Sequence, residues 1–280
     1  MAPIQDLSDD LELLRSNAVA AGILALSRFR QPIKTWTKAN ESPVTEADII
    51  VDQFLRASLC GARPDYGWLS EESVDDESRL DRRRTFIVDP IDGTRAYIRG
   101  EDCWTVSLAI VEDGIAVAGV IFAPARDELF DARAGFGARI NGVPLRRQPH
   151  KGGKLVIPAP GAIHRELAEA GVDYEHGPAL PSIAYRLVQV ATGRFDAVAG
   201  RRGAQDWDIA GAAAILAECG VGFEDVCAGP LVFNKRETRH AGLAAFAEPG
   251  LKAPLHDALR RVYGCPAEAT DAQQAMRQGL

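Results

Sequence analysis

Two carboxylates lie three residues apart in the segment VDPIDGT, residues 88–94. Asp89 and Asp92 follow the apolar run at residues 86–88, which is typical of a buried strand, so they would lie where a strand leaves a sheet. Like charges held this close raise the free energy of the fold unless a positive charge lies between them. Mg²⁺ prefers carboxylate and carbonyl oxygens, with water and substrate phosphate completing its shell. The pair therefore indicates a site for a hard divalent cation.

Three other acidic positions could share that site: Asp48 in SPVTEAD, Glu71 in WLSEES and Asp208 in DWDIAGAAA. Each also has a purely structural interpretation. Asp48 could complete a capping box with Thr45, Glu71 could belong to a solvated acidic loop with Glu72, and Asp208 could be a favourable charge in a first helical turn. No His or Cys accompanies these acids, which disfavours zinc.

The residues that follow the aspartate pair could bind phosphate. Gly93 permits a sharp turn or a close approach of another group, and Thr94 begins a short predicted helix whose free N–H groups suit a phosphate. Segment 88–94 would then supply oxygens for a metal and amides for its substrate.

The elements that must position these residues follow from periodicity. One predicted helix begins after an N-cap at Ser8, and a second covers about residues 46–60, closed by Gly61. Residues 104–135 read as successive strands joined by turns at 113–114 and 124, and residues 154–264 alternate short strands with helices. A polar, glycine-rich stretch at 146–154 separates the two regions. We expect an α/β protein with subdomains at 1–148 and 149–266 and a polar tail at 267–280.

Composition narrows the possible partners. The 280 residues carry a net charge of -7, which excludes binding of nucleic acid by bulk charge. The five cysteines are scattered without a CxxC pair, which argues against a disulfide framework and against a structural zinc site. No basic leader and no membrane-length apolar run is present, so we expect a cytoplasmic protein without a membrane partner.

Four motifs taken together resemble the ordered motifs of the inositol monophosphatase family: SPVTEAD, SEES, VDPIDGT and WDIAGAAAILAECG. The order and spacing agree over residues 11–263. The resemblance implies a layered αβαβα sugar-phosphatase fold, with an α+β N-terminal half, an α/β C-terminal half and metals between them. It also implies a lithium-sensitive, Mg²⁺-dependent phosphomonoesterase, commonly a homodimer, that binds two to three ions.

The resemblance also implies roles for individual residues. The implied metal ligands are Glu71, Asp89, the carbonyl of Ile91, Asp92 and Asp208. The implied catalytic residues are Asp48 and Thr94, which orient a water, together with Glu71; the implied substrate-binding residues are Gly93, Thr94, Asp208 and Arg201. A metal-activated water would attack phosphorus directly, without a phosphoenzyme intermediate.

Local features are more similar to the bacterial CysQ-like 3'(2'),5'-bisphosphate nucleotidases than to the inositol enzymes. They include LSEE with Ser70, RAYIRG after the DGT, and GVIFAPARDELFDARAG. Arg201, with Arg202 beside it, lies where inositol enzymes place an acidic residue, and an arginine suits a second phosphate better than a hydroxyl. The alternative is a solvated arginine loop. Arg186 could bind the substrate or lie on an exposed helix face.

The sequence therefore predicts hydrolysis of 3'-phosphoadenosine 5'-phosphate to AMP and phosphate. The alternatives are an inositol-1-monophosphatase, or a phosphatase of another small sugar phosphate or of histidinol phosphate. The hypothesis of a different class is a catalytically silent regulator that binds metal or phosphate. The sequence argues against it, because none of the acidic motif positions is substituted. His164 and His240 are interpreted as structural or surface residues, because metal-assisted hydrolysis does not require them.

Overall fold

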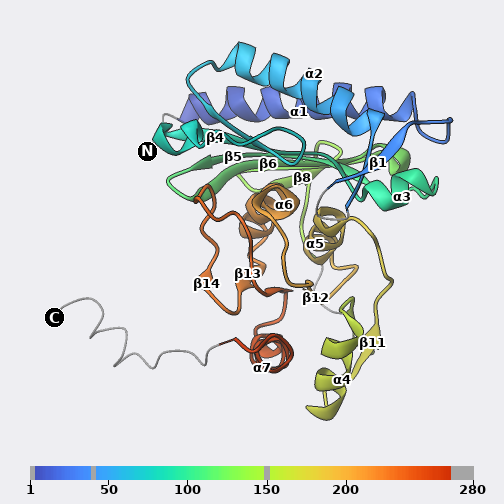
Figure 1. The fold of residues 1–280 in the computed structure, drawn as a ribbon. Coiled ribbons are helices and arrows are strands. Elements are labelled where there is room, and N and C mark those ends of the chain that lie inside the picture. Colours follow the sequence, from blue (N-terminus) through green and yellow to red (C-terminus); the bar gives the residue numbers. More distant parts are fainter. Residues whose placement is uncertain (1–3, 39–41, 148–151, 266–280) are drawn as a thin grey trace.

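The computed structural model describes residues 4–38, 42–147 and 152–265, and Figure 1 shows that they form five layers. The helices α1 (Ile4–Leu26) and α2 (Glu46–Ala62) cover one face of a large sheet. On its other face lie α5 (Ile183–Thr192) and α6 (Asp206–Glu218), followed by a smaller sheet and by α4 (Gly161–Glu169) and α7 (Lys252–Tyr263). The expected αβαβα layering is confirmed.

The large sheet contains seven strands in sequence order: β3 (Gly67–Ser70), β4 (Arg84–Asp92), β5 (Thr105–Glu112), β6 (Ile115–Ala123), β7 (Glu128–Arg133), β8 (Ala138–Ile140) and β9 (Val143–Pro144). The strand β3 pairs parallel with β4, and every later neighbour pairs antiparallel. All nine residues of β4 are buried because helices cover both of its faces. This burial explains the apolar run at residues 86–88 in its middle.

Side chains of β4 alternate between the two cores. Phe86 and Val88 pack in the core under α1 and α2, whereas Ile87 packs in the core with α5 and α6. On the α6 side, β6 and α6 approach so closely that a Cβ at Gly119 would lie 2.2 Å from the carbonyl oxygen of Gly211. Glycine at this crossing therefore fixes the height of α6 above the sheet.

The small sheet is antiparallel, in the order β12 (Ala197–Ala199), β15 (Leu243–Phe246), β13 (Gly222–Asp225) and β14 (Gly229–Pro230). Two strand pairs flank the layers, β1 (Thr35–Thr37) with β2 (Pro43–Thr45) and β10 (Leu155–Ile157) with β11 (Tyr174–His176). Short helical turns complete the chain: η1 (Ser78–Asp81), α3 (Thr94–Ile98), η2 (Pro124–Arg126) and η3 (Pro249–Leu251).

Some local predictions need correction or remain open. The first helix begins at Ile4, upstream of the predicted N-cap Ser8, and α2 continues through Gly61 to Ala62. The predicted boundary at 148–149 and the polar tail at 267–280 lie outside the described residues. Among the described helices, none is long and apolar enough to cross a membrane.

One disulfide joins Cys227 to Cys265, 38 residues apart. The scattered cysteine spacing argued against a disulfide framework, and this single bond was not predicted because only the fold brings the end of α7 beside the loop after β13. Cys60, Cys103 and Cys219 are free thiols.

Candidate active site

Three aspartates, of which Asp89 and Asp92 are buried and Asp208 is half-buried, meet where β4 ends and α6 begins. Asp89 and Asp92 lie at the C-terminal end of β4, and Asp208 lies in the first turn of α6. One carboxylate oxygen of each lies within 4.8 Å of the others. The strand pairing is irregular between Asp89 and Asp92, so the chain bends between them. This bend, with Pro90 inside it, directs both carboxylates to one place.

The electrostatics of this cluster fit a divalent cation. Burial raises the pKa of Asp89 well above its usual range, and the negative charges of Glu71 and Asp92 raise it further. Burial likewise raises the pKa of Asp208, and it raises that of Asp92 to about 6 although hydrogen bonds oppose it. No Lys or Arg of the described residues bonds to any of the three. Such a donor set of oxygens short of positive charge suits a hard cation.

Asp92 is held by the N-terminus of α5. The Ser182 hydroxyl donates to Asp92 Oδ2 at 2.5 Å, and the backbone N–H of Ala184 donates to the same oxygen at 2.8 Å. Ser182 is also the N-cap of α5, since its oxygen accepts from the N–H of Tyr185. A carboxylate at a helix N-terminus is electrostatically favourable. Ser182 was not recognised from the sequence, because only the fold brings α5 to β4.

Asp48 completes the capping box that the sequence indicated, and its side chain also contacts Thr94. Its Oδ2 accepts from the N–H and the hydroxyl of Thr45, which completes the capping box of α2. Its Oδ1 accepts from the Thr94 hydroxyl at 3.1 Å, and that hydroxyl lies equally close to the carbonyl oxygen of Ile91. Burial raises the pKa of Asp48 to about 6. The capping box therefore fixes the carboxylate whose second oxygen faces Thr94.

Glu71 and Glu72 are not a solvated loop, which corrects that interpretation. Lys38 Nζ lies 2.9 Å from Glu71 Oε1 and 2.7 Å from Glu72 Oε1. The residues on either side of the two glutamates are also anchored, because the hydroxyls of Ser70 and Ser73 both donate to the buried carboxylate of Asp52. Glu71 is thus oriented at the rim of the aspartate cluster. Nothing in the sequence pattern pointed to Lys38.

Gly93 occupies a position that other residues would strain. Its φ is 95°, in the left-handed region, and an added Cβ would lie 3.1 Å from the carbonyl oxygen of Cys103. Glycine here lets the chain turn from β4 into α3 directly beside the aspartates.

A cavity of about 550 Å³ opens over the cluster. Its acidic lining residues, Glu71, Asp89, Asp92 and Asp208, all belong to the metal-site candidates. The other charged lining residues are arginines: Arg95, Arg99, Arg186, Arg201 and Arg202. A third part of the wall is apolar and rich in proline, from residues 158–160 and 177–181. The cavity therefore combines a carboxylate floor with a basic wall.

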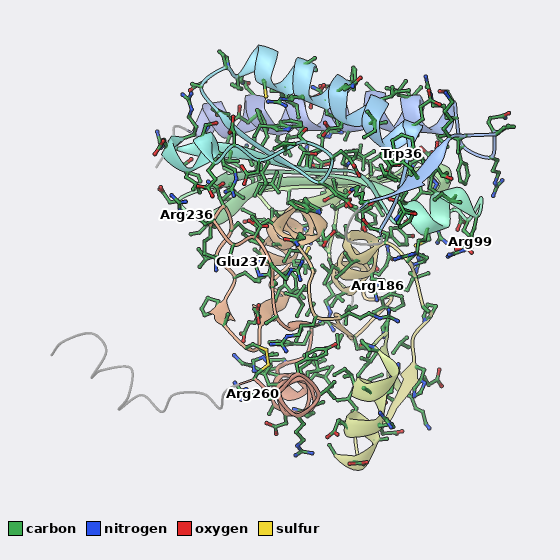
Figure 2. All side chains as sticks on the ribbon, in the orientation of Figure 1. Trp36, Arg99, Arg186, Arg236, Glu237 and Arg260 are labelled. Carbon is green, nitrogen blue, oxygen red and sulfur yellow. A yellow bond between two sulfur atoms is a disulfide. The ribbon has the colours of Figure 1, made fainter. Side chains whose placement is uncertain are left out.

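Arg186 and Arg201 face this cavity without ion-pair partners among the described residues. Figure 2 places Arg186 on α5, below the large sheet. Its Nε is buried without a hydrogen-bond partner, and burial lowers the pKa of its guanidinium, opposed by the charge of Asp92. This answers the question that the sequence left open, since Arg186 does not lie on an exposed helix face.

The two histidines considered in the sequence, His164 and His240, lie outside the cavity lining. His240 is buried and bonds through Nε2 to Asp206 at 2.8 Å, and His164 stacks on His176 with ring centroids 3.7 Å apart. Both contacts are structural, in agreement with the sequence interpretation.

Comparisons with known proteins give matches over most of the chain. The sequence model described as the inositol monophosphatase family matches residues 6–259. An inositol-1-monophosphatase of Mesorhizobium japonicum is 33% identical over 66% of this chain and 73% of its own length. A 3'(2'),5'-bisphosphate nucleotidase CysQ of Aggregatibacter actinomycetemcomitans is 29% identical over 75% and 82%. A histidinol-phosphatase of Chlorobaculum parvum is 38% identical, but the match spans about half of each chain, 50% and 54%.

The solved structures show the same fold. The extragenic suppressor protein SuhB of Bartonella henselae superposes with a TM-score of 0.78 at 28% identity, over 90% of this chain and 99% of its own. An inositol monophosphatase of Thermotoga maritima gives a TM-score of 0.76 at 23% identity, over 92% and 98%. These relatives carry different substrate names, so the fold alone does not select a substrate.

Proposed function

Because this chain belongs to the inositol monophosphatase family, whose members are phosphatases, we propose that it is a 3'(2'),5'-bisphosphate nucleotidase. It would hydrolyse 3'-phosphoadenosine 5'-phosphate to AMP and phosphate. One observation carries the choice of substrate: Arg186 and Arg201 face the cavity without an ion-pair partner in the part of the chain that the structure describes, while the acidic lining residues all lie at the carboxylate floor. A substrate with a second phosphate supplies the missing negative charge.

The charge of the wall weighs against the other candidates. Histidinol phosphate carries an ammonium group, which the arginines would repel and no carboxylate outside the floor would bind. Inositol 1-phosphate offers neutral hydroxyls to the same arginines, yet the relative named inositol-1-monophosphatase keeps it as the second candidate. A catalytically silent regulator is disfavoured because all the acidic motif positions are retained.

For the floor we propose Mg²⁺, two to three ions, held by Glu71, Asp89, Asp92, Asp208 and the carbonyl of Ile91. When bound there, the metal would lower the pKa of a coordinated water and offset charge on phosphate oxygens. The chain's own residues then orient the reactants. Asp48 Oδ1 and the Thr94 hydroxyl form the hydrogen-bonded pair that would hold the attacking water and accept its proton at Asp48.

The substrate phosphate would lie against the turn at Gly93 and Thr94, which lines the cavity beside the aspartates. Asp208 faces the cavity from α6 and would contact both metal and substrate. Ser182 and α5 keep Asp92 oriented throughout, because their donors occupy one of its oxygens. A cytoplasmic homodimer sensitive to lithium completes the proposal; gel filtration with light scattering and inhibition by Li⁺ would test the last two properties.

Phosphate release tests the substrate. The enzyme is assayed with 3'-phosphoadenosine 5'-phosphate, inositol 1-phosphate and histidinol phosphate, each with Mg²⁺ and with EDTA. We expect a preference for the bisphosphate that EDTA abolishes.

Arg201→Ala tests the basic wall. It should raise KM for the bisphosphate about 10- to 100-fold, the worth of one charged hydrogen-bonded pair. Arg165→Ala, an exposed arginine of α4, is the matched control and should leave KM unchanged. Preference for inositol 1-phosphate, or an Arg201→Ala enzyme with unchanged KM for the bisphosphate, would refute the proposal.

A further inference from the structure

The loop at residues 200–203 carries Arg201 and Arg202 into the cavity, and both arginines are exposed. Its ends are bound to the body of the protein: the N–H of Gly200 donates to the carbonyl of Leu243 at 2.8 Å, and the N–H of Gly203 donates to that of His240 at 2.9 Å. The two residues between these anchors need another support, because long exposed arginine side chains lose entropy when they are ordered.

That support comes from the C-terminal end of α7. The Tyr263 hydroxyl donates to the carbonyl oxygen of Gly200 at 3.1 Å, and Arg202 Nη1 donates to the carbonyl oxygen of Tyr263 at 3.1 Å. Burial raises the pKa of the Tyr263 phenol, against the opposing charges of Arg201 and Arg202, so ring and loop lie close together. One residue therefore holds both the start of the loop and one of its arginines.

The disulfide fixes this residue. Tyr263 ends α7, Gly264 caps the helix with φ 61°, and Cys265 follows directly. The bond from Cys265 to Cys227 ties this end to the loop after β13 (Figure 2 shows the sulfur pair beside α7). An added Cβ at Gly242 would meet both Cys227 Sγ and the Tyr263 ring at 3.3 Å, so sulfur and ring pack on the same glycine. Disulfide, tyrosine and arginine loop thus form one contiguous chain of contacts.

We propose that the Cys227–Cys265 disulfide, acting through Tyr263 as a positioning residue, holds the 200–203 loop in the conformation that presents Arg201 to the second phosphate of the substrate. This inference rests on the proposed nucleotidase function. Reduction of the bond would release the end of α7 and weaken binding of the bisphosphate, while the metal-binding floor, which lies on β4 and the start of α6, would keep its chemistry.

The redox step is a thiol–disulfide exchange with a dithiol. One thiolate of the dithiol attacks a sulfur of the pair, the S–S bond breaks, and the departing cysteine sulfur takes a proton. The second thiol then resolves the mixed disulfide, leaving Cys227 and Cys265 as thiols and the dithiol as a cyclic disulfide. Both cysteines are partly exposed, which gives a reductant access.

The experiment compares two substrates that share the scissile phosphate. Steady-state kinetics of the Mg²⁺-loaded enzyme are measured with 3'-phosphoadenosine 5'-phosphate and with adenosine 3'-phosphate, which lacks the second phosphate. Each is assayed in air-oxidised protein and after dithiothreitol, with thiols counted in both states. We expect two additional thiols on reduction, a 3- to 10-fold higher KM for the bisphosphate with kcat within twofold, and an unchanged KM for the monophosphate.

Variants separate positioning from general damage. Cys265→Ser should show the reduced-state KM without dithiothreitol, and Tyr263→Phe should show a raised bisphosphate KM in both redox states. Cys60→Ser, a free thiol on α2, is the matched control and should keep the full redox response. If Cys265→Ser does not fold, reduction of the native chain remains a complete test.

The outcomes separate this inference from the function that it extends. An oxidised enzyme that does not prefer the bisphosphate over the monophosphate refutes the proposed function, and the inference with it. A preference that survives reduction and Cys265→Ser unchanged refutes the inference alone. So does a loss that affects both substrates equally, or a count of five free thiols in the oxidised protein.

Discussion

Replacing Asp89 by Asn should stabilise the metal-free protein and abolish its activity. Asp89 and Asp92 are buried and Asp208 is half-buried, and one carboxylate oxygen of each lies within 4.8 Å of the others. Two unit charges at that separation repel by about 3.5 kcal/mol at an effective dielectric constant of 20. The pKa of Asp92, raised from 3.8 to about 6, corresponds to a penalty of about 3 kcal/mol on its charged form. The cluster is therefore a source of strain until a cation enters it.

Asn keeps the shape and one acceptor oxygen of Asp89, including an acceptor for the N–H of Ile91. Because partial protonation already relieves some of the repulsion, we expect a net gain of about 1–2 kcal/mol, or a Tm higher by about 2–8 °C in EDTA. Mg²⁺ should raise the Tm of the native protein and should raise that of Asp89→Asn far less. Turnover should fall at least about 1000-fold, since a ligand to the metal is lost.

Differential scanning calorimetry in EDTA and over a Mg²⁺ titration measures the change in Tm, and phosphate release measures the loss of turnover. Asp113→Asn makes the same chemical change in the exposed turn between β5 and β6, so it should change neither quantity. An Asp89→Asn protein that is less stable than the native chain in EDTA would show that the cluster is not a repulsive site awaiting a cation. Retention of near-normal turnover would sink the metal assignment.

Two further predictions concern elements around the site. Gly119→Ala should lower the free energy of unfolding by about 2–3 kcal/mol and also lower activity, because the added Cβ would lie 2.2 Å from the Gly211 carbonyl oxygen and displace α6 with Asp208. Urea unfolding measures the stability, and phosphate release measures the activity. Gly61→Ala is the control, because its added Cβ would have no atom within 4 Å, and it should change neither quantity. Tyr66→Phe should destabilise the protein at pH 8, because the hydroxyl donates to Asp10 and accepts from Arg84. Burial raises the pKa of Tyr66 to about 12, so the stability from its protonated form is complete below pH 10 and is lost as the pH rises through 12. The difference in unfolding free energy from the native chain should therefore narrow at pH 11, and a constant difference would contradict this account.

The acidic floor could be predicted from the sequence because its chemistry is concentrated in short segments. An apolar run that ends in two aspartates defines both a buried strand and its exit, and Asp208 marks the start of a helix. The layered fold followed from the resemblance, while periodicity located α2 within two residues of its observed bounds. These are local signals, which survive without knowledge of the tertiary structure.

The supports of the floor could not be predicted, because each contact joins distant segments. Lys38 reaches Glu71 across 33 residues, and Ser182 reaches Asp92 across 90. A serine before a helix signals only an N-cap, and a lysine in a loop signals nothing. The disulfide is a similar case, since the spacing of Cys227 and Cys265 matches no motif.

The basic wall could be predicted only in part: the sequence pointed to Arg201 but left the position of Arg186 open, and that position depends on α5. Its first turn gives the N–H of Ala184 to Asp92, and the same turn places Arg186 on the cavity wall. One helix terminus therefore contacts the aspartate cluster and contributes an arginine to the cavity wall. Since the bonds to Asp92 come from the backbone and from Ser182, the side chain at position 186 can change without loss of that support. We therefore expect that substitution of Arg186 or Arg201 alters the choice of substrate while the carboxylate floor stays intact.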